Sequence, residues 1–161
     1  MSGVLEALSE KPLLCDGAMG TQLQLQGLKP GECGDSWNVE YPDRVRAIQK
    51  GYVDAGADCL TSNTFGACRI SLQRHDYADQ VREINEAAVH IAREAFGASR
   101  GFVLGDIGPF GGLMEPFGNV SAQEVRESFR EQAQALVGAG VDAIIIETQT
   151  DLSELGIALQ E

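Results

Sequence analysis

Short apolar runs along the chain alternate with longer segments in which apolar residues recur every three or four positions. Runs of the first kind predict β-strands, and segments of the second kind predict amphipathic helices. Each apolar run leads into a polar residue. The runs cover residues 12–15, 59–62, 102–105 and 143–146, and the polar residues that follow are Asp16, Asn63, Asp106 and Glu147.

Helical periodicity fills the intervals between these runs, with expected helices over residues 45–55, 81–95, 125–137 and 155–159. Ser121 and Glu124 form a capping-box pattern before the third helix, in which each side chain satisfies a backbone N–H. Gly97 is placed to end the second helix, and Asp151 with Glu154 opens the fourth. The order of elements is therefore strand and helix in alternation, four times.

Such an order, with right-handed crossovers, predicts an α/β fold built on a parallel sheet. Two architectures fit four units: a complete open doubly wound sheet, or the N-terminal half of a (β/α)8 barrel. Long Gly- and Pro-rich loops over residues 23–41 and 108–120 favour the barrel, because barrels build active sites in loops at these positions. We therefore expect residues 1–161 to form a parallel (βα)4 half of a TIM barrel.

The composition of the chain makes some classes of binding partner unfavourable. The formal net charge is −12, which disfavours binding to nucleic acid or to an anionic membrane surface. No apolar stretch approaches the roughly 20 residues of a membrane span, and the first eleven residues lack the pattern of a signal peptide. A cytoplasmic location is the expectation. The four cysteines are scattered without a C-x-x-C pair, so they predict no metal site.

The polar residues that end the apolar runs lie 47, 43 and 41 positions apart. The carboxyl ends of parallel strands meet at one edge of a sheet, where α/β folds place their chemistry. We therefore expect Asp16, Asn63, Asp106 and Glu147 to lie near one another.

Three interpretations of the Asp16-Gly17-x-x-Gly20 turn stay open. It can be a tight strand-to-helix turn, a weak phosphate-binding loop, or a site where Asp16 holds the ammonium group of a small substrate. Glu147 follows three isoleucines and is either a capping or ion-paired carboxylate or a second carboxylate at the same cationic group. Asn63 and Thr64 add hydrogen-bonding groups at the end of the second strand.

Five stretches, taken together and in order, resemble the homocysteine S-methyltransferase family. They are Asp16-Gly17-Ala18-Met19-Gly20-Thr21, Tyr52-x-x-Ala55-Gly56-Ala57-Asp58, Thr61-x-Asn63-Thr64-Phe65, Gly108-Pro109 and Glu147-Thr148. The resemblance implies a (β/α)8 barrel in which a zinc-bound homocysteine thiolate accepts a methyl group and becomes methionine. It also implies substrate binding by Asp16 and Glu147, and we add Gly17, Asn63 and Thr64 as expected substrate-binding residues.

The same resemblance implies that the three zinc-binding cysteines lie in the second half of the barrel, so this chain is expected to contain no metal ligand and no catalytic residue. The family more often has a small or neutral residue at the position of Asp106, and its role stays open. So does the identity of the methyl donor.

The expected function is homocysteine methylation by a complete zinc-dependent barrel, of which this chain carries the amino-acid-binding half. Alone it is expected to be inactive, and its unpaired sheet edges predict a homodimer or a complementing second half-barrel. The alternatives are a non-catalytic α/β module that binds a small amino acid or phosphate, and a scaffold fragment with no ligand.

Overall fold

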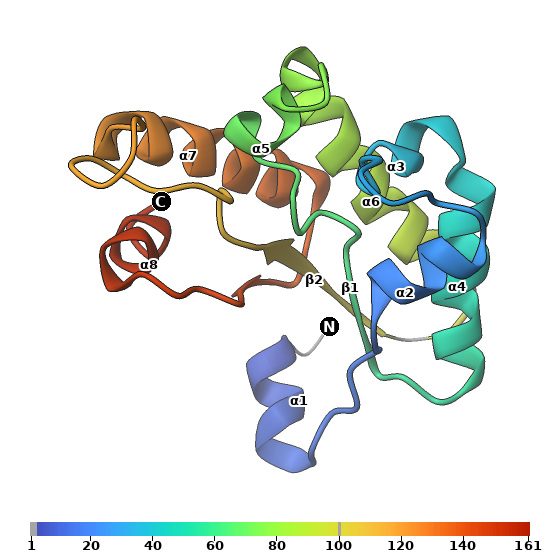
Figure 1. Cartoon of the computed structure of the whole chain (residues 1–161). Helices are drawn as coiled ribbons and strands as arrows, with labels where there is room; N and C mark the ends of the chain where they lie inside the picture. The colour runs from blue at the N-terminus through green and yellow to red at the C-terminus, as the bar shows by residue number, and fades with distance from the viewer. Residues whose placement is uncertain (1–2, 100) are drawn as a thin grey trace.

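The computed structural model describes residues 3–99 and 101–161, which form an α/β fold around a parallel sheet (Figure 1). The strands β1 (Cys59–Thr61), β2 (Phe102–Ile107) and β3 (Ala143–Ile146) lie side by side in that order. Thr61 is opposite Leu104, and Asp106 is opposite Ile145. The predicted fold class, α/β with a parallel sheet, is confirmed.

The first expected strand, over residues 12–15, is reduced to a single parallel bridge between Cys15 and Cys59. The carbonyl oxygen of Leu14 accepts bonds from the N–H groups of Asp58 and Cys59, at 2.7 and 3.0 Å, so this segment still lies along β1. The Leu14 N–H, however, donates to the side chain of Asp58 and not to a strand carbonyl. Because Pro12 has no N–H either, the ladder has too few donors on this segment to continue.

The expected helices are present, and additional short ones accompany them. The bounds are α1 (Val4–Glu10), α2 (Met19–Leu25), α3 (Trp37–Glu40), α4 (Pro42–Asp54), α5 (Arg69–Gln73), the 3₁₀ helix η1 (Ala78–Gln80), α6 (Val81–Phe96), α7 (Ala122–Ala139) and α8 (Leu152–Ala158). The long segment over residues 23–41, expected as a loop, contains the end of α2 and all of α3. Neither α1 nor α5 was predicted; α1 carries Val4, Leu5 and Leu8 at helical spacing, but it has no buried residue.

The capping box of α7 forms as predicted. The N–H of Glu124 donates to Ser121 Oγ at 3.2 Å, and the N–H of Ser121 donates to the Glu124 carboxylate at 2.8 Å. At α8 only the first part of the pattern is used: Asp151 accepts from the Ser153 N–H at 2.7 Å. Glu154 is buried and accepts instead from the N–H of Phe110 at 2.7 Å, which ties α8 to the loop after β2.

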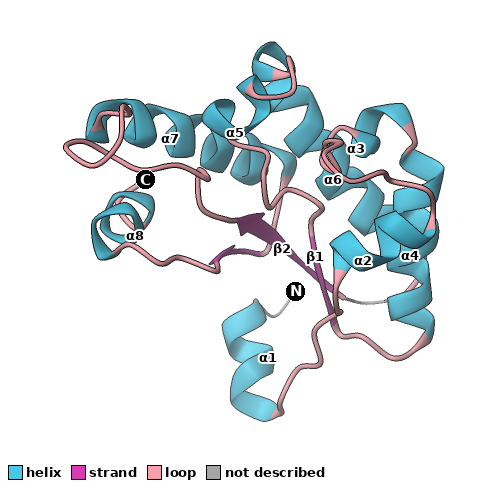
Figure 2. Cartoon of the chain, in the orientation of Figure 1, coloured by secondary structure: helices cyan, strands magenta, loops and turns pink. Residues whose placement is uncertain are grey.

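The helices form an arc around the strands in Figure 2, and one face of the sheet packs against them. Leu60, Val103 and Ile107 belong to the largest core cluster, together with apolar residues of α6, α7 and α8. The alternate residues Thr61 and Asp106 lie on the opposite face. All four residues of the edge strand β3 are only partly buried, whereas most residues of β1 and β2 are buried.

Within the described ranges, no helix has both the length and the apolar character needed to span a bilayer.

Candidate functional site

A cavity of about 420 Å³ lies at the carboxyl ends of the strands, and we call it the rim cavity. Four separate segments line it: residues 15–20, residues 61–65, Asp106, and Ile145 with Glu147. All five residues expected to bind substrate are on its wall, namely Asp16, Gly17, Asn63, Thr64 and Glu147. The structure therefore brings together residues that are up to 131 positions apart, as the spacing of the strand ends predicted.

Asp16 is fixed by Thr61, its neighbour across the sheet edge. The Thr61 N–H donates to one carboxylate oxygen of Asp16 at 3.0 Å, and the Thr61 hydroxyl donates to the other at 3.0 Å. Burial raises the pKa of Asp16, although the bonds from Thr61 act in the opposite direction. A carboxylate has about four lone-pair sites, so Asp16 keeps acceptor capacity for a ligand. Thr61 itself was not predicted, but it lies two residues before Asn63, on the same face of the strand.

Glu147 comes directly after β3 and lines the same cavity as Asp16. Its N–H donates to the carbonyl of Ile107 at 3.1 Å, which extends the pairing of β3 with β2 to the edge of the sheet. The negative charge of Glu147 contributes to the raised pKa values of both Asp16 and Asp106. Thr148 has a φ of 59°, an unusual conformation for a β-branched residue that marks a sharply constrained turn at this edge.

Gly17 lies against Tyr52 of α4. A Cβ at this position would lie 3.2 Å from the Tyr52 ring, closer than ordinary contact allows. The Tyr52 hydroxyl donates to the carbonyl of Ala18 at 2.9 Å, so the same ring also fixes the turn into α2. The absence of a side chain at Gly17 thus brings the backbone of this wall close to α4.

Asn63 and Thr64 line the rim cavity, but their side chains bond to the protein. The Asn63 amide donates to the carbonyl of Gly34 at 2.9 Å and to Asn38 at 3.0 Å, which joins β1 to the long loop before α3. The Thr64 hydroxyl donates to the carbonyl of Asp106 at 2.7 Å. In this structure the side chains of both residues therefore shape the wall; a direct bond to substrate stays a prediction.

Asp106, whose role the sequence left open, is the most buried carboxyl group of the cavity, at 5% exposure. Its N–H donates to Ser62 Oγ at 3.0 Å, and its carbonyl accepts from Thr64 and from Gln132 of α7. Its side-chain Oδ1 has no hydrogen-bond partner. Burial and then the charge of Glu147 raise the pKa of Asp106 to about 8.

The cysteines do not fit a zinc site. Cys33, Cys59 and Cys68 are buried, and Cys15 is exposed. Burial raises the pKa of Cys33 to about 11 and that of Cys59 to about 12, which favours the thiol over the thiolate that zinc requires. Among the described residues, no group of three or more His, Cys, Asp and Glu is arranged to hold a metal ion. We therefore derive no step through a metal on this chain.

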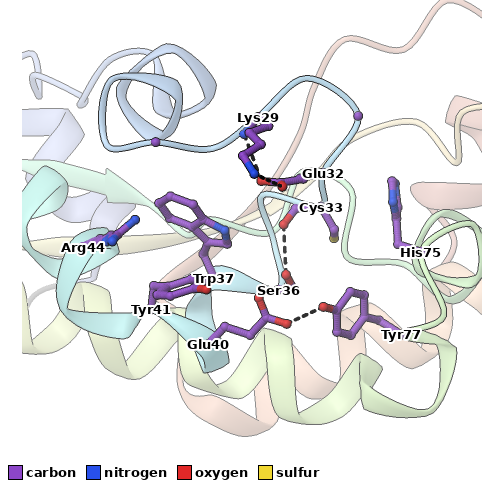
Figure 3. A pocket seen from close by; sticks show the side chains of 12 residues that line it. Lys29, Glu32, Cys33, Ser36, Trp37, Glu40, Tyr41, Arg44, His75 and Tyr77 are labelled. Atoms are coloured by element: carbon purple, nitrogen blue, oxygen red, sulfur yellow. Dashed lines mark hydrogen bonds and ion pairs between the residues drawn. The ribbon is translucent and has the colours of Figure 1, made fainter.

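A second cavity, of about 450 Å³, lies among the loop before α3, α3 itself and the segment near η1, and we call it the loop cavity (Figure 3). Several of its polar side chains have hydrogen-bond partners, either another side chain or the backbone. The Tyr77 hydroxyl donates to Glu40, the Ser36 hydroxyl donates to the carbonyl of Cys33 at 3.0 Å, and Glu32 accepts from the Lys29 N–H at 2.9 Å.

Comparison with known proteins identifies relatives of one kind. The family model described as homocysteine S-methyltransferase matches residues 13–161. Methionine synthase of Mycobacterium tuberculosis (strain ATCC 25618 / H37Rv) is 34% identical over 167 residues, and that of Mycobacterium leprae (strain TN) is 33% identical over 169 residues. Each alignment covers 97% of this chain but only 14% of the relative.

Solved structures of a homocysteine methyltransferase share the fold. The metallated form of the homocysteine methyltransferase MmuM from Escherichia coli superposes with a TM-score of 0.80 at 25% identity. The oxidized form gives the same TM-score at 26% identity. The superposition on the metallated form covers 97% of this chain and 61% of that protein. The chain thus corresponds to part of each relative.

Proposed function

The chain belongs to the homocysteine S-methyltransferase family, and from this premise we propose that it forms the half of a methyltransferase barrel that holds the amino-acid end of homocysteine. The observation that carries the proposal is the rim cavity. Carboxyl groups from the first and last segments of the sheet, Asp16 and Glu147, line this one cavity. Two carboxylates near each other are costly unless a cation lies between them, and an α-ammonium group is such a cation.

In this proposal the segments that line the rim cavity bind different groups of the ligand. Asp16, fixed by Thr61, and Glu147, at the constrained turn after β3, accept hydrogen bonds from the ligand's ammonium group. The backbone N–H groups of the turn at Gly17 take the ligand's carboxylate. The amino acid is then held at one end, and its sulfur is oriented by the rest of the molecule. Such positioning lowers the entropic cost of the reaction.

The reaction itself transfers a methyl group to sulfur. The thiol proton leaves, the sulfur forms a bond to the methyl carbon, and the bond from that carbon to the donor breaks with its electron pair on the donor. A thiolate is required because the thiol is a poor nucleophile. In the complete family domain we expect a zinc ion to stabilise the thiolate, held by residues outside this chain. The chain alone is therefore expected to bind its ligand without methyl transfer.

The exposed edges of the sheet support the proposal that a second half-barrel packs against this one. Leu14, on the segment beside β1, is 58% exposed, and the residues of β3 at the other edge are only partly buried. Both edges carry unpaired backbone groups that pair readily with further strands. We propose that a second half-barrel, supplied by further chain or by a second copy, covers them. Size measurement of the chain alone and with such a partner tests this part.

Calorimetric titration with L-homocysteine tests the proposed function. We expect binding to the wild-type chain and at least about tenfold weaker binding, near 1.4 kcal/mol, for Asp16→Asn and for Glu147→Gln. Glu32→Gln, which removes a carboxylate of the loop cavity, is the matched control and is expected to bind like the wild type. Equal affinity in all four proteins would refute the proposal.

The alternative of a phosphate ligand is not favoured by this cavity. Three carboxyl groups, those of Asp16, Asp106 and Glu147, line it, and each would repel a phosphate in proportion to its charge. Titration with inorganic phosphate in parallel distinguishes the two ligand classes: phosphate binding at the first turn, with no binding of homocysteine, would favour the alternative.

A further inference from the structure

The carboxyl group of Asp106 is a buried acidic group that the proposed function does not use. It is 5% exposed, it lines the rim cavity, and its Oδ1 has no hydrogen-bond partner among the described residues. A buried carboxylate without a partner costs several kcal/mol, so the group must either hold a proton or meet a cation.

The position of Asp106 is fixed by its backbone. Ser62 accepts from its N–H at 3.0 Å, Thr64 donates to its carbonyl at 2.7 Å, and Gln132 of α7 donates to the same carbonyl at 3.3 Å. With the backbone bonded on both sides, the main chain at Asp106 is fixed, and its carboxyl group is buried in the wall of the cavity.

The charges that face Asp106 are all negative. Glu147 after β3 and Asp16 before α2 line the same cavity, and burial first, then the charges of Glu147, Asp35 and Asp16, raise the pKa of Asp106. The groups on the other adjoining elements, Ser62 and Gln132, are neutral. The described residues that line the cavity include no Lys, Arg or His. A buried carboxyl group that faces only like charges is stable when it holds a proton.

We propose that the carboxyl group of Asp106 holds a proton in the empty rim cavity, and that the ammonium group of an α-amino acid displaces this proton when it binds. This inference rests on the proposed function, because it takes the ligand to be an amino acid. On binding, the O–H bond of the Asp106 carboxyl group breaks, its electron pair stays on the carboxylate, and the proton passes to solvent. The ammonium N–H groups then donate to the carboxylates in its place.

The exchange gives the site a dependence on pH. Below neutrality a larger fraction of the Asp106 carboxyl group holds its proton, so the fraction of the protein that is ready to accept a cation falls. The affinity for an amino acid should therefore rise by about tenfold per pH unit between pH 6 and 7.5, where the ammonium group of the ligand stays charged. Asp106 acts here as a positioning and selectivity residue that favours cationic amino groups.

The test uses the full 161-residue chain and L-methionine, which has no thiol proton to complicate the titration. Calorimetry in buffers of different ionisation enthalpy measures the protons released per ligand. We expect about one proton for the wild type at pH 6.5, and close to none for Asp106→Asn, with a flat affinity between pH 6 and 7.5. Glu154→Gln is the matched control: Glu154 is also a buried carboxyl group with a raised pKa, but it lies outside the rim cavity, so release should be unchanged.

A second measurement requires no ligand. Infrared difference spectra of the empty chain should contain a protonated-carboxyl band at pH 7 that is lost in Asp106→Asn and kept in Glu154→Gln. Absence of this band, or methionine binding without proton release, would overturn the inference and leave the proposed function intact. Failure of methionine and homocysteine to bind at all would refute the proposed function and the displacement step. The infrared band would still report whether the Asp106 carboxyl group holds a proton.

Discussion

The rim cavity and the loop cavity have similar volumes, about 420 and 450 Å³, yet they differ in how their polar groups are satisfied. In the loop cavity several polar side chains bond to another side chain or to the backbone, and Arg44 lies over the rings of Trp37 and Tyr41 at 5.2 and 4.9 Å (Figure 3). In the rim cavity Asp106 is left without a partner for Oδ1 and faces other acids. The two cavities therefore do not differ in volume but in the presence of a buried carboxyl group whose hydrogen bonds are not satisfied.

The largest expected effect concerns the backbone beneath the rim cavity. Gly108 lies after β2, and a Cβ there would be 2.6 Å from the carbonyl oxygen of Phe65, which also lines the cavity. Gly108→Ala must separate these segments and should lower the free energy of unfolding by about 2–4 kcal/mol. Urea denaturation measures the change.

The control for that substitution is Gly20→Ala. Gly20 lies in α2, and no atom comes within 4 Å of the position that a Cβ would take, so alanine fits there. Because alanine favours helix over glycine, we expect an increase in stability of about 0.5–1 kcal/mol. Equal losses in both variants would show that the close approach at Gly108 is not a structural requirement.

The second expected effect is a difference between the two cavities in how a carboxyl group of each affects stability as the pH changes. Because the pKa of Asp106 is raised in the folded state, its contribution favours folding at low pH and is lost as the pH rises from about 4 to about 8. Asp106→Asn removes this loss, so the variant should exceed the wild type in stability by about 1–3 kcal/mol at pH 8 and by little at pH 4. Denaturation at both pH values measures the difference.

Glu32→Gln in the loop cavity is the companion measurement. This carboxylate is exposed and bonded to the Lys29 N–H, and its replacement should change stability by less than about 0.5 kcal/mol at either pH. If Glu32→Gln raised the free energy of unfolding at pH 8 as much as Asp106→Asn does, the distinction between the two cavities would be lost.

The smallest effect lies in the loop cavity itself. Arg44 contacts the faces of Trp37 and Tyr41 and donates to the carbonyl of Gln26 at 3.0 Å. Arg44→Ala should cost about 1 kcal/mol of stability and leave methionine affinity unchanged. Lys50→Ala, which removes an exposed ion pair with Asp54, should cost close to nothing by the same denaturation measurement. Loss of methionine binding in Arg44→Ala would instead place the ligand in the loop cavity.

Periodicity predicted the elements that pack through an apolar stripe. The helices α4, α6, α7 and α8 were found because their apolar residues recur every three or four positions, and the three strands were found because they are short apolar runs. The helices α1 and α5 were missed, since they span only seven and five residues and bury one residue between them. The strand over residues 12–15 was overestimated, because pattern alone does not reveal that the Asp58 side chain takes the N–H of Leu14.

The candidate site was predictable as a location more than as a set of contacts. Strand ends in a parallel sheet must share an edge, so Asp16 and Glu147 followed from spacing. The bonds of Asn63 to Gly34 and Asn38 join segments 25 or more positions apart, and no local pattern indicates them. Nor does any local pattern measure the burial of Asp106, whose importance arises from the elements that surround it.

A crystal structure of the chain with L-methionine tests the central claim most directly. We expect the ligand in the rim cavity, with its ammonium nitrogen at about 3 Å from carboxylate oxygens of both Asp16 and Glu147. A methionine bound in the loop cavity, or one whose ammonium group contacts neither carboxylate, would contradict this claim.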